Sequence, residues 1–468
     1  MALNALDRHL ALVGFMGAGK TTIAAELSPR LARPVVEVDR EIEARYREAI
    51  PQIFEAEGEA AFRRVEASVL GETLALHRSA IVDLGAGAAT FPDNHGLLAA
   101  EAFTLLLDVD VETAWERVSG TDRPLAQDEG SFRRLYAERA PIYRQVADAT
   151  VASGDVDGAV LAAAGVHHEP GSLERLGELV PGDGPVALVA DATVLGLHGS
   201  VATQALGERL VATHEVPPGE AAKQLPVAER LWSELTLDRG GTVVALGGGS
   251  TTDLAAFAAA TYLRGIPWVA VPTTLVGQVD AGIGGKTAID LPEGKNLVGA
   301  FHWPARVVID ETLLETLPER ERRQGMAELI KTELLAGRSL GVRGAAAYKA
   351  ALCLRDPYDR GPRRWLNLGH TFGHALEAAG GFELPHGDAV ALGLLAALRL
   401  SGRDTAAVVD ALDPQPVHVD RERAWEALLR DKKAERGEIN LVLLGDDGPY
   451  VETRPPNEVR AALDTLIA

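Results

Sequence analysis

Two short segments far apart in the chain carry residues whose types and spacing suit chemistry. Residues 14–21 read Gly-Phe-Met-Gly-Ala-Gly-Lys-Thr, and residues 367–374 read Asn-Leu-Gly-His-Thr-Phe-Gly-His. The first segment is a phosphate-binding loop, in which glycines let backbone N–H groups turn towards phosphate oxygens. The second supplies part of a metal site, because imidazole nitrogens are common zinc ligands. Two unrelated chemistries predict a fused chain with two enzymatic units.

The phosphate-binding loop comes at the end of a short apolar run, residues 10–15, and a helical pattern begins at Lys20. In this strand–loop–helix context the pattern Gly-x4-Gly-Lys-Thr binds a nucleotide. Lys20 is expected to contact the β- and γ-phosphates of ATP, and Thr21 to hold Mg²⁺. The helix N-terminus adds a favourable dipole for the anion. The predicted nucleotide-binding residues of this loop are Gly17, Gly19, Lys20, Thr21 and Thr22.

A group of ligand-type residues lies in helical patterns of the C-terminal third. Glu328 and Lys331 are three positions apart, so they share one face of a helix. His370 and His374 are four apart and also share a face, and His386 follows them. A carboxylate with two or three imidazoles predicts a zinc site, and three protein ligands leave an open position, as in catalytic sites. The spacing alone leaves open which histidines bind the ion.

Two further groups of residues suit a dinucleotide and an anionic substrate. Gly247–Ser250 follows an apolar run, and a Gly-rich turn between a strand and a helix suits a pyrophosphate. Thr273 and Thr274 follow the next apolar run and offer hydroxyl groups to a ribose or phosphate. Lys286 and Lys295 lie in a Gly-rich segment with little helix or strand pattern, which predicts a pocket for an anionic substrate.

The composition bounds the class of protein. Of 468 residues, 47% are hydrophobic and 24% charged, which is typical of a soluble globular protein with two or three domains. Cys353 is the single cysteine, so a disulfide framework is excluded and a cytoplasmic location is expected. The net charge of −21 argues against a nucleic-acid partner, because phosphate backbones require a basic surface. No apolar run is long enough to cross a membrane, so no membrane partner is expected.

The elements that must position these residues alternate along most of the chain. Apolar runs between helical patterns predict an α/β fold with parallel sheets. The runs lie at residues 10–15, 35–38, 80–84, 104–109, 186–190, 243–246 and 268–271. From about residue 311 strand signals nearly vanish, which predicts a mostly helical region. Its amphipathic patterns lie at residues 319–336, 340–355, 370–380 and 387–402.

These patterns predict three domains. A P-loop domain at residues 1–160 is followed by a linker rich in Gly and Pro at 161–182. A nucleotide-binding α/β domain is expected at 183–310, and a helical metal- and substrate-binding domain at 311–468.

Residues 8–150 resemble shikimate kinase over nearly the whole length of that family. The resemblance rests on the P-loop, Glu37-x-Asp39, Ile53-Phe54-x3-Gly58-Glu59-x2-Phe62-Arg63-x2-Glu66, Asp83-Leu84-Gly85-Ala86-Gly87, Arg123-Pro124-Leu125 and Arg139-x-Pro141-x-Tyr143. It implies that Asp39 takes a ring hydroxyl of shikimate and that Arg63 and Arg139 clamp its carboxylate, a natural partner of the planar guanidinium. It also implies that Gly85, Ala86 and Gly87 line the acceptor, that Arg117 lies near the adenine, and that Arg123 belongs to a lid. By this resemblance, the expected catalytic residues of the kinase half are Lys20, Asp39 and Arg123.

Two positions depart from that family's pattern. The usual Asp-x-Asp pair is Glu37-x-Asp39 here, so the first carboxylate is one methylene longer. The usual Gly-Gly-Gly acceptor loop has Ala86 in the middle, and an alanine costs about 1 kcal/mol or more if the position requires positive φ. Ala86 therefore motivates an alternative in which only the C-terminal half is active and the P-loop half is a nucleotide-binding scaffold.

Residues 183–460 resemble 3-dehydroquinate synthase, an NAD- and zinc-dependent sugar-phosphate cyclase. The match lies at residues 247–253, 272–275, 280–287, 294–301, 327–331, 366–375 and 430–433. The resemblance implies that Glu328, His370 and His386 bind Zn²⁺, and the same ligands also accept Co²⁺. His374 then transfers protons and contacts phosphate. The implied substrate contacts and catalytic groups are Asp280, Lys286, Asn296, Lys331, Lys349, Arg363, Asn367 and Lys432, and the implied NAD site is Asp191, Glu220, Lys223, Gly248, Gly249, Asp253, Thr273 and Thr274.

Together the two resemblances imply a bifunctional enzyme of aromatic-precursor biosynthesis. The first half would phosphorylate shikimate with MgATP. The second would convert 3-deoxy-arabino-heptulosonate 7-phosphate into 3-dehydroquinate with release of phosphate, and NAD would be regenerated in each turnover. Cyclase relatives suggest a homodimer through this half. Two alternatives stay open for it: another sugar phosphate as substrate, or an alcohol oxidation like that of glycerol dehydrogenase, with accumulation of NADH.

Overall fold

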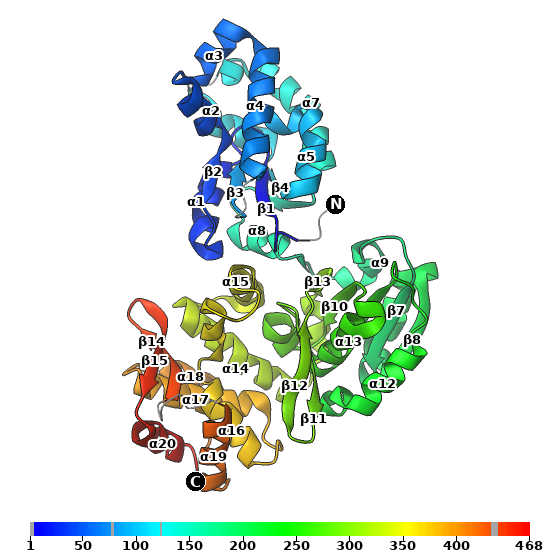
Figure 1. The fold of residues 1–468 in the computed structure, drawn as a ribbon, viewed down its shortest axis with the longest axis vertical. Helices are drawn as coiled ribbons and strands as arrows, with labels where there is room; N and C mark the ends of the chain where they lie inside the picture. Colours follow the sequence, from blue (N-terminus) through cyan, green and yellow to red (C-terminus); the bar gives the residue numbers. More distant parts are fainter. Residues whose placement is uncertain (1–3, 76–78, 122–123, 432–438) are drawn as a thin grey trace. The chain divides into compact units, whose positions relative to one another are not determined.

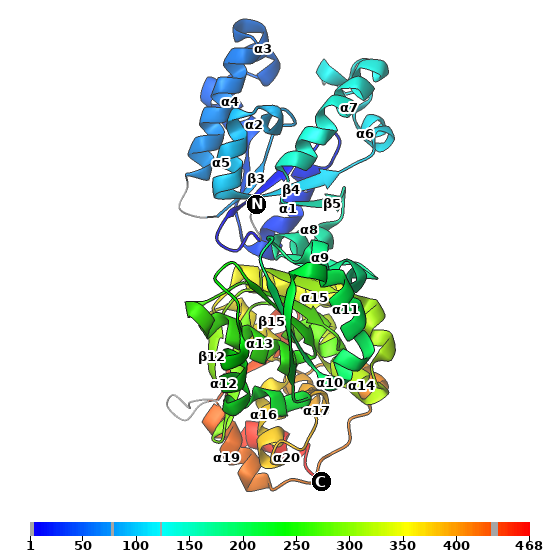
Figure 2. The same ribbon diagram turned by 90° about the vertical axis from the view of Figure 1, so that its right-hand side faces the viewer.

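The computed structural model describes residues 4–75, 79–121, 124–431 and 439–468. These residues form two compact units, which divide between His167 and His168 (Figures 1 and 2). Within the described ranges, no helix combines the length and the apolar character that a membrane span requires.

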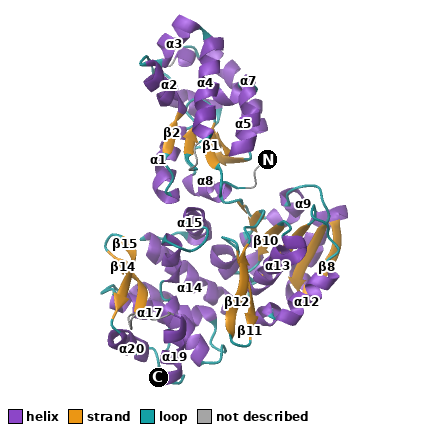
Figure 3. Cartoon of the chain, in the orientation of Figure 1, coloured by secondary structure: helices purple, strands orange, loops and turns teal. Residues whose placement is uncertain are grey.

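The first unit is a parallel sheet with flanking helices (Figure 3). The strand order is β2-β3-β1-β4-β5, and β1 is buried along its whole length, as expected for a strand with neighbours on both sides and helices on both faces. The strands are β1 (His9–Val13), β2 (Val35–Glu37), β3 (Ile81–Asp83), β4 (Ala102–Asp108) and β5 (Ala149–Ala152). The helices are α1 (Lys20–Leu31), α2 (Val38–Tyr46), α3 (Ile50–Glu57), α4 (Glu59–Leu74), α5 (Asp93–Glu101), α6 (Val111–Val118), α7 (Glu129–Val146) and α8 (Val156–Ala163).

The second unit begins with another sheet, of order β6-β13-β10-β9-β7-β8. Its strands are β6 (Val166–His168), β7 (Val186–Asp191), β8 (Leu210–Val216), β9 (Thr242–Gly247), β10 (Trp268–Pro272) and β13 (Arg306–Ile309). The helices of this part are α9 (Leu176–Leu179), α10 (Ala192–Val194), α11 (Ser200–Leu206), α12 (Leu225–Glu234) and α13 (Gly249–Thr261). An antiparallel hairpin of β11 (Lys286–Leu291) and β12 (Gly294–Phe301) lies beside α13 (Figure 1).

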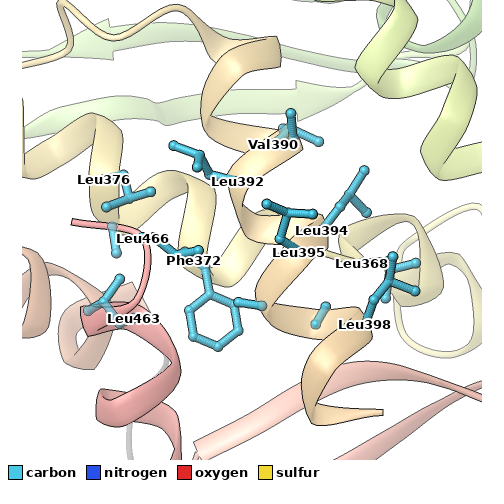
Figure 4. Close-up of a cluster of buried hydrophobic side chains, with 14 of the residues drawn as sticks. Leu368, Phe372, Leu376, Val390, Leu392, Leu394, Leu395, Leu398, Leu463 and Leu466 are labelled. Atoms are coloured by element: carbon cyan, nitrogen blue, oxygen red, sulfur yellow. The ribbon is translucent and has the colours of Figure 1, made fainter. Parts of the chain in front are cut away.

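The rest of the second unit is mostly helical. Its elements are α14 (Glu319–Ala336), α15 (Gly341–Arg355), α16 (His370–Ala379), α17 (His386–Leu400), α18 (Ala406–Leu412), α19 (Arg421–Asp431), β14 (Ile439–Gly445), β15 (Gly448–Arg454) and α20 (Pro456–Asp464). Helix α17 is apolar nearly all round, as expected for a helix with neighbours on every side. It packs with α16 and α20 in a cluster of buried side chains that includes Phe372, Leu392, Leu395 and Leu463 (Figure 4).

Close backbone contact fixes α16 against α17. A Cβ on Gly369, just before α16, would lie 2.8 Å from the backbone nitrogen of Leu394, and φ there is 78°. A side chain on Gly393 would overlap the carbonyl of Gly369. Because both positions exclude any side chain, the two helices meet at one register. His370 and His386, the first residues of these helices, are thereby held on a rigid pair of elements.

The structure confirms the strands expected from apolar runs and the four long helical patterns. Two expectations are wrong in detail. The linker predicted at residues 161–182 contains the end of α8, strand β6 of the second sheet and helix α9. The segment around Lys286 and Lys295, expected to lack regular structure, is the hairpin of β11 and β12. The region from about residue 311 is mostly helical, as expected, and also contains the hairpin of β14 and β15.

Candidate active sites

The phosphate-binding loop of the first unit lies between β1 and α1, as the sequence predicts. Gly17 has φ of 81°, and a Cβ there would lie 2.8 Å from the carbonyl oxygen of Ala114, so only glycine fits. Gly19 precedes α1 with φ of 78°. Lys20 Nζ donates to the carbonyl oxygen of Gly14 at 3.1 Å, so the lysine folds over the loop. Thr22 lies in the first turn of α1 with an exposed side chain.

Arg117 lies against the same loop. Its Nη1 donates to the carbonyl oxygen of Gly17 at 2.9 Å and to Ser153 Oγ at 2.6 Å. Ser153 Oγ in turn donates to the carbonyl oxygen of Ala18 at 2.9 Å. Arg117 and Ser153 therefore brace the loop from the side of β5. The sequence offered no signal for Ser153, because it is far from the loop in the chain.

Carboxylates gather at the C-terminal ends of β2 and β3, beside the P-loop threonine. Thr21 Oγ1 donates to Asp83 Oδ2 at 2.6 Å, and Asp83 is buried at the end of β3. The strand register places Glu37 directly beside Asp83. Glu37 is paired with Arg40, whose Nε lies 2.9 Å from Glu37 Oε2. The hydroxyl expected to hold Mg²⁺ is thus in contact with Asp83, a residue to which the sequence assigned no role.

The residues predicted to bind the acceptor come together in one place. Arg63 Nη1 lies 2.7 Å from Glu66 Oε2 on helix α4. A Cβ on Gly85 would lie 2.5 Å from Asp39 Oδ1, and one on Gly87 would overlap the guanidinium of Arg63. The loop at residues 85–87 therefore forms one wall, against which the Asp39 and Arg63 side chains lie.

Ala86 fits this loop without backbone strain. It is absent from the residues with positive φ, so the alanine costs no left-handed conformation. Its carbonyl oxygen accepts a hydrogen bond from Tyr143 Oη at 2.5 Å. The strain that motivated the scaffold alternative is therefore not present.

Glu66 is the buried ionisable group of this pocket, with a side chain only 1% exposed. Burial raises the pKa of Glu66 to about 7, although Arg63 acts in the opposite direction. Asp39 raises it further and Arg139 lowers it, so both of these predicted residues lie close to Glu66. The same burial raises the pKa of Tyr143 to about 12, against the effect of Arg139. The expected lid residue Arg123 lies outside the described residues.

In the second unit Glu328, His370 and His386 converge from α14, α16 and α17. One ligand atom from each lies within 4.8 Å of the others. Glu328 Oε1 is 3.1 Å from His386 Nε2 and 3.4 Å from His370 Nε2. His374, the remaining histidine, lies with its ring centroid 5.4 Å from that of His370. The geometry therefore selects His370 and His386 as the pair that faces Glu328.

The electrostatics of this trio suit a cation. Glu328 has no exposed surface and forms an ion pair with Lys331. Burial alone would raise the pKa of Glu328, but Lys331 and His370 hold it well below its ordinary value. Burial lowers the pKa of His370, which favours the neutral imidazole that a metal requires. His370 Nδ1 lies 3.2 Å from the carbonyl oxygen of Leu368, which leaves Nε2 for the ion.

Several predicted substrate residues are held by ion pairs, and one of them, Asp280, lies close enough to Glu328 and Lys331 to interact with their charges. Lys349 pairs with Asp280 and is 7% exposed. Burial alone would raise the pKa of Asp280, but Lys349 holds it below its ordinary value. Lys286 Nζ lies 2.5 Å from Asp359 Oδ2, a partner that the sequence did not indicate.

Arg363 and Asn367 lie in the segment before α16. Arg363 donates to the carbonyl oxygens of Gly284 and Pro357, each at 2.9 Å. Asn367 ends a 3-10 helix, Pro362–Asn367. Lys432, the predicted phosphate-binding lysine, lies outside the described residues.

The predicted nucleotide residues form a second cluster at the C-terminal ends of β7, β9 and β10. Lys223 Nζ lies 2.7 Å from Asp253 Oδ2 and also contacts the side chain of Asn296. Glu220 Oε1 accepts a hydrogen bond from Ser250 Oγ at 2.9 Å. Asn296, expected at the substrate, thus lies with the nucleotide residues.

The turn itself carries glycines where space is short. A Cβ on Gly248 would lie 3.0 Å from Thr274 Cγ2, and Gly249 begins helix α13. Thr273 N donates to the carbonyl oxygen of Gly247 at 3.0 Å. Asp191 caps α10 through Oδ1, which accepts from Thr193 N at 2.9 Å. Among the described residues no side chain caps the N-terminus of α13, and an uncapped helix N-terminus suits a pyrophosphate.

Comparison with known proteins matches both halves. The model of the shikimate kinase family matches residues 16–164, and the models of the N- and C-terminal parts of 3-dehydroquinate synthase match residues 213–324 and 308–434. The bifunctional shikimate kinase/3-dehydroquinate synthase of Thermotoga maritima is 32% identical over 92% of this chain and 94% of its own length. The chain belongs to the family of bifunctional shikimate kinase/3-dehydroquinate synthases. It is therefore an enzyme with both of these activities, as the sequence predicted.

Other similar proteins match the synthase half alone. The 3-dehydroquinate synthase of Symbiobacterium thermophilum is 41% identical over 63% of this chain and 96% of its own length. A solved 2-deoxy-scyllo-inosose synthase shares the fold, with a TM-score of 0.57 and 23% identity over 64% of this chain and 96% of that one. A 2-epi-5-epi-valiolone synthase from Streptomyces hygroscopicus superposes with a TM-score of 0.54 and 26% identity over the same shares.

For this bifunctional enzyme, sequence motifs indicated the residues predicted to bind ligands but not the groups that contact those residues. Asp83, Glu66, Asp359 and Glu377 are carboxylates in contact with Thr21, Arg63, Lys286 and His386. Asp83 and Glu66 lie inside the quoted shikimate kinase motifs, so their positions were visible but their partners were not. Asp359 meets Lys286 across 73 positions of the chain, and Glu377 meets His386 from the preceding helix; no sequence signal indicated either pair.

Proposed function

We propose that the first unit transfers the γ-phosphoryl group of ATP to shikimate in the presence of Mg²⁺. The main support for this proposal is that Asp39, Arg63 and Glu66 lie together. Arg63 pairs with Glu66, and the Asp39 and Arg63 side chains lie against the loop at residues 85–87 that follows β3. Arg63, held by Glu66, would clamp the shikimate carboxylate together with Arg139. Asp39 would accept the proton of the reacting hydroxyl, and Lys20 would move from the Gly14 carbonyl to the phosphates. Mg²⁺ would neutralise phosphate charge, held by Thr21.

We propose that the second unit converts 3-deoxy-arabino-heptulosonate 7-phosphate into 3-dehydroquinate with NAD and a divalent ion. The convergence of Glu328, His370 and His386 within 4.8 Å, in the same unit as the Gly-rich turn before α13, carries this proposal. A bound Zn²⁺ or Co²⁺ would polarise substrate oxygens. NAD, held at Lys223, Asp253 and the turn, would accept and return a hydride. Solved fold relatives contain NAD⁺ with Co²⁺ or Zn²⁺.

The chain's own residues then orient the substrate and manage protons. Lys286, Lys331, Lys349 and Arg363 would position its anionic groups, because fixed cations around a buried site stabilise charge without reorganisation. His374 lies beside the metal trio without being part of it, so it would exchange a proton with substrate or phosphate.

One experiment on the full chain separates the two activities. ATP turnover with shikimate and phosphate release from the heptulosonate phosphate are measured separately, with and without a chelator that binds Zn²⁺ far more strongly than Mg²⁺. Phosphate release is expected to be lost and to return on addition of Zn²⁺ or Co²⁺, while ATP turnover persists. Phosphate release that survives removal of the ion contradicts the proposed metal site. ATP binding without turnover on shikimate supports the scaffold alternative, and net accumulation of NADH supports an alcohol dehydrogenase.

A further inference from the structure

Glu377 is a buried carboxylate close to the metal trio that no motif singled out. It lies on α16, one turn beyond His374, and only 4% of it is exposed. Glutamate is almost never fully buried unless it is paired. The partners of Glu377 therefore indicate its role.

The Glu377 carboxylate faces the second nitrogen of a predicted metal ligand. Glu377 Oε1 lies 3.5 Å from His386 Nδ1, while His386 Nε2 lies 3.1 Å from Glu328 Oε1. The imidazole of His386 is thus held between two carboxylates, one on each side. We propose that Glu377 is a positioning residue, whose carboxylate accepts Nδ1–H of His386 and so presents Nε2 to the ion.

The other histidine of the trio is held in a parallel way. His370 Nδ1 lies 3.2 Å from the carbonyl oxygen of Leu368, and its Nε2 faces Glu328. A neutral imidazole has one N–H, so an acceptor at Nδ1 fixes the tautomer whose Nε2 lone pair is free to bind a metal. The two ligands thereby have matched outer partners, a backbone carbonyl for His370 and a carboxylate for His386.

Lys295 approaches the same Glu377 oxygen that faces His386. Lys295 Nζ lies 3.8 Å from Glu377 Oε1 and 3.8 Å from Glu220 Oε2, and it lies 5.1 Å from the ring centroid of Phe382. The ammonium therefore draws on the same carboxylate oxygen that faces His386, and it supplies one of the positive charges around this buried group. Lys295, expected from the sequence to bind the anionic substrate, thus links the metal trio to the nucleotide cluster.

The inference rests on the proposed metal site and is tested by affinity for the metal alone. Zn²⁺ affinity of the full chain is measured by competition with a chromogenic chelator, for the wild type and for Glu377→Gln and Glu377→Ala. A loss of 10- to 100-fold is expected for Glu377→Ala, as for other outer-shell partners of histidine ligands. Glu377→Gln keeps an acceptor but loses the charge, so a smaller loss is expected. Visible absorption of the Co²⁺-loaded chain reports whether His386 still binds.

Two further variants separate this role from general distortion. Glu383→Gln changes an exposed glutamate three residues before His386 and should leave Zn²⁺ affinity unchanged. Lys295→Met removes the cation that competes for Glu377, so Zn²⁺ affinity should stay the same or rise. A loss of Zn²⁺ affinity in the variants at position 377, with no loss in Lys295→Met, would be hard to produce by unfolding.

The Zn²⁺ affinities and Co²⁺ spectra of these variants either support or overturn the role proposed for Glu377. Equal Zn²⁺ affinity and an equal Co²⁺ spectrum in the wild type and both Glu377 variants overturn the inference, as does an equal loss in Lys295→Met. A wild-type chain that binds neither ion overturns the proposed metal site itself. If Glu377→Ala does not fold, Glu377→Gln and Lys295→Met still show whether Zn²⁺ affinity falls at position 377 and not at position 295.

Discussion

Thr21 Oγ1 donates a hydrogen bond of 2.6 Å to Asp83 Oδ2, and this joins the P-loop helix to the end of strand β3. Glu37, which stands where shikimate kinases usually have an aspartate, is beside Asp83 in the sheet but pairs with Arg40. P-loop enzymes hold Mg²⁺ through the loop hydroxyl and a carboxylate at the end of a neighbouring strand. In this chain Asp83 is the carboxylate that already contacts the hydroxyl.

The first prediction follows from this contact. Replacing Asp83 by Ala should raise the Mg²⁺ concentration that half-saturates ATP turnover by about 10- to 100-fold, because Thr21 loses the acceptor that orients it. Asp83→Asn keeps an acceptor and should lose less. Glu37→Gln is the matched control at the adjacent strand end, with an expected change below about threefold. A larger effect at Glu37 than at Asp83 would assign the role to Glu37 instead. Titrations of Mg²⁺ at fixed concentrations of ATP and shikimate measure the half-saturating Mg²⁺ concentration of each variant.

The second prediction concerns the acceptor loop. Gly87→Ala places a methyl group on the guanidinium of Arg63, a flexible side-chain end, so the protein should fold while Arg63 is displaced. The KM for shikimate is expected to rise at least about tenfold, equivalent to about 1.4 kcal/mol, with ATP affinity unchanged. Ala86→Gly is the control, and because Ala86 has no positive φ its KM should stay within about threefold. Equal effects at both positions would contradict the geometry.

The third prediction is a pH dependence of the stability of the first unit. Burial raises the pKa of Glu66 to about 7 in the folded state, so the folded state binds its proton more tightly than the unfolded chain does. The stabilisation is complete below about pH 4.5 and is lost as pH rises through about 7, by up to about 3 kcal/mol. Hydrogen exchange of the β1 amides, corrected for intrinsic rates, measures this loss.

Two variants on helix α4 test the assignment to Glu66. Glu66→Gln removes the titrating group and should flatten the profile between about pH 4.5 and 7. Glu72→Gln, at an exposed position of the same helix, should leave the profile intact. A profile that stays steep in Glu66→Gln would show that another group is responsible.

Much of the fold was visible in the sequence because apolar periodicity reports burial directly. Buried parallel strands such as β9 read as continuous apolar runs, and α14 to α17 show the helical period. The hairpin of β11 and β12 was missed for a physical reason. A Cβ on Gly299 would overlap the carbonyl oxygen of Thr287 on the paired strand, so the pairing itself demands glycine there and weakens the alternating pattern.

The two candidate sites can be predicted from the sequence only where their residues lie close together in the chain. The P-loop and the spacing of His370 and His374 are local, whereas choosing His386 over His374 required either a family resemblance or coordinates. The side chains that contact the predicted binding residues cannot be predicted from spacing. Glu377 meets Lys295 and Asp83 meets Thr21 across long stretches of sequence, and a lone carboxylate on a helix or strand end is usually a surface or capping residue.

The fourth prediction uses the buried pair of Glu328 and Lys331, both of which have almost no exposed surface. Glu328→Gln leaves the Lys331 ammonium without its counter-charge, and breaking a buried pair in this way costs about 3 to 5 kcal/mol. We expect the metal-free second unit to lose about this much stability, together with Zn²⁺ binding and phosphate release. The double variant Glu328→Gln with Lys331→Met should regain much of the stability but neither Zn²⁺ binding nor phosphate release, since the ligand stays absent. Because the loss belongs to the second unit, ATP turnover with shikimate should be unchanged in both variants. Chelator-treated protein in a urea titration, followed by hydrogen exchange of the β9 and α17 amides, measures the stability. A single variant as stable as the double would show that Lys331 finds another partner or loses its proton.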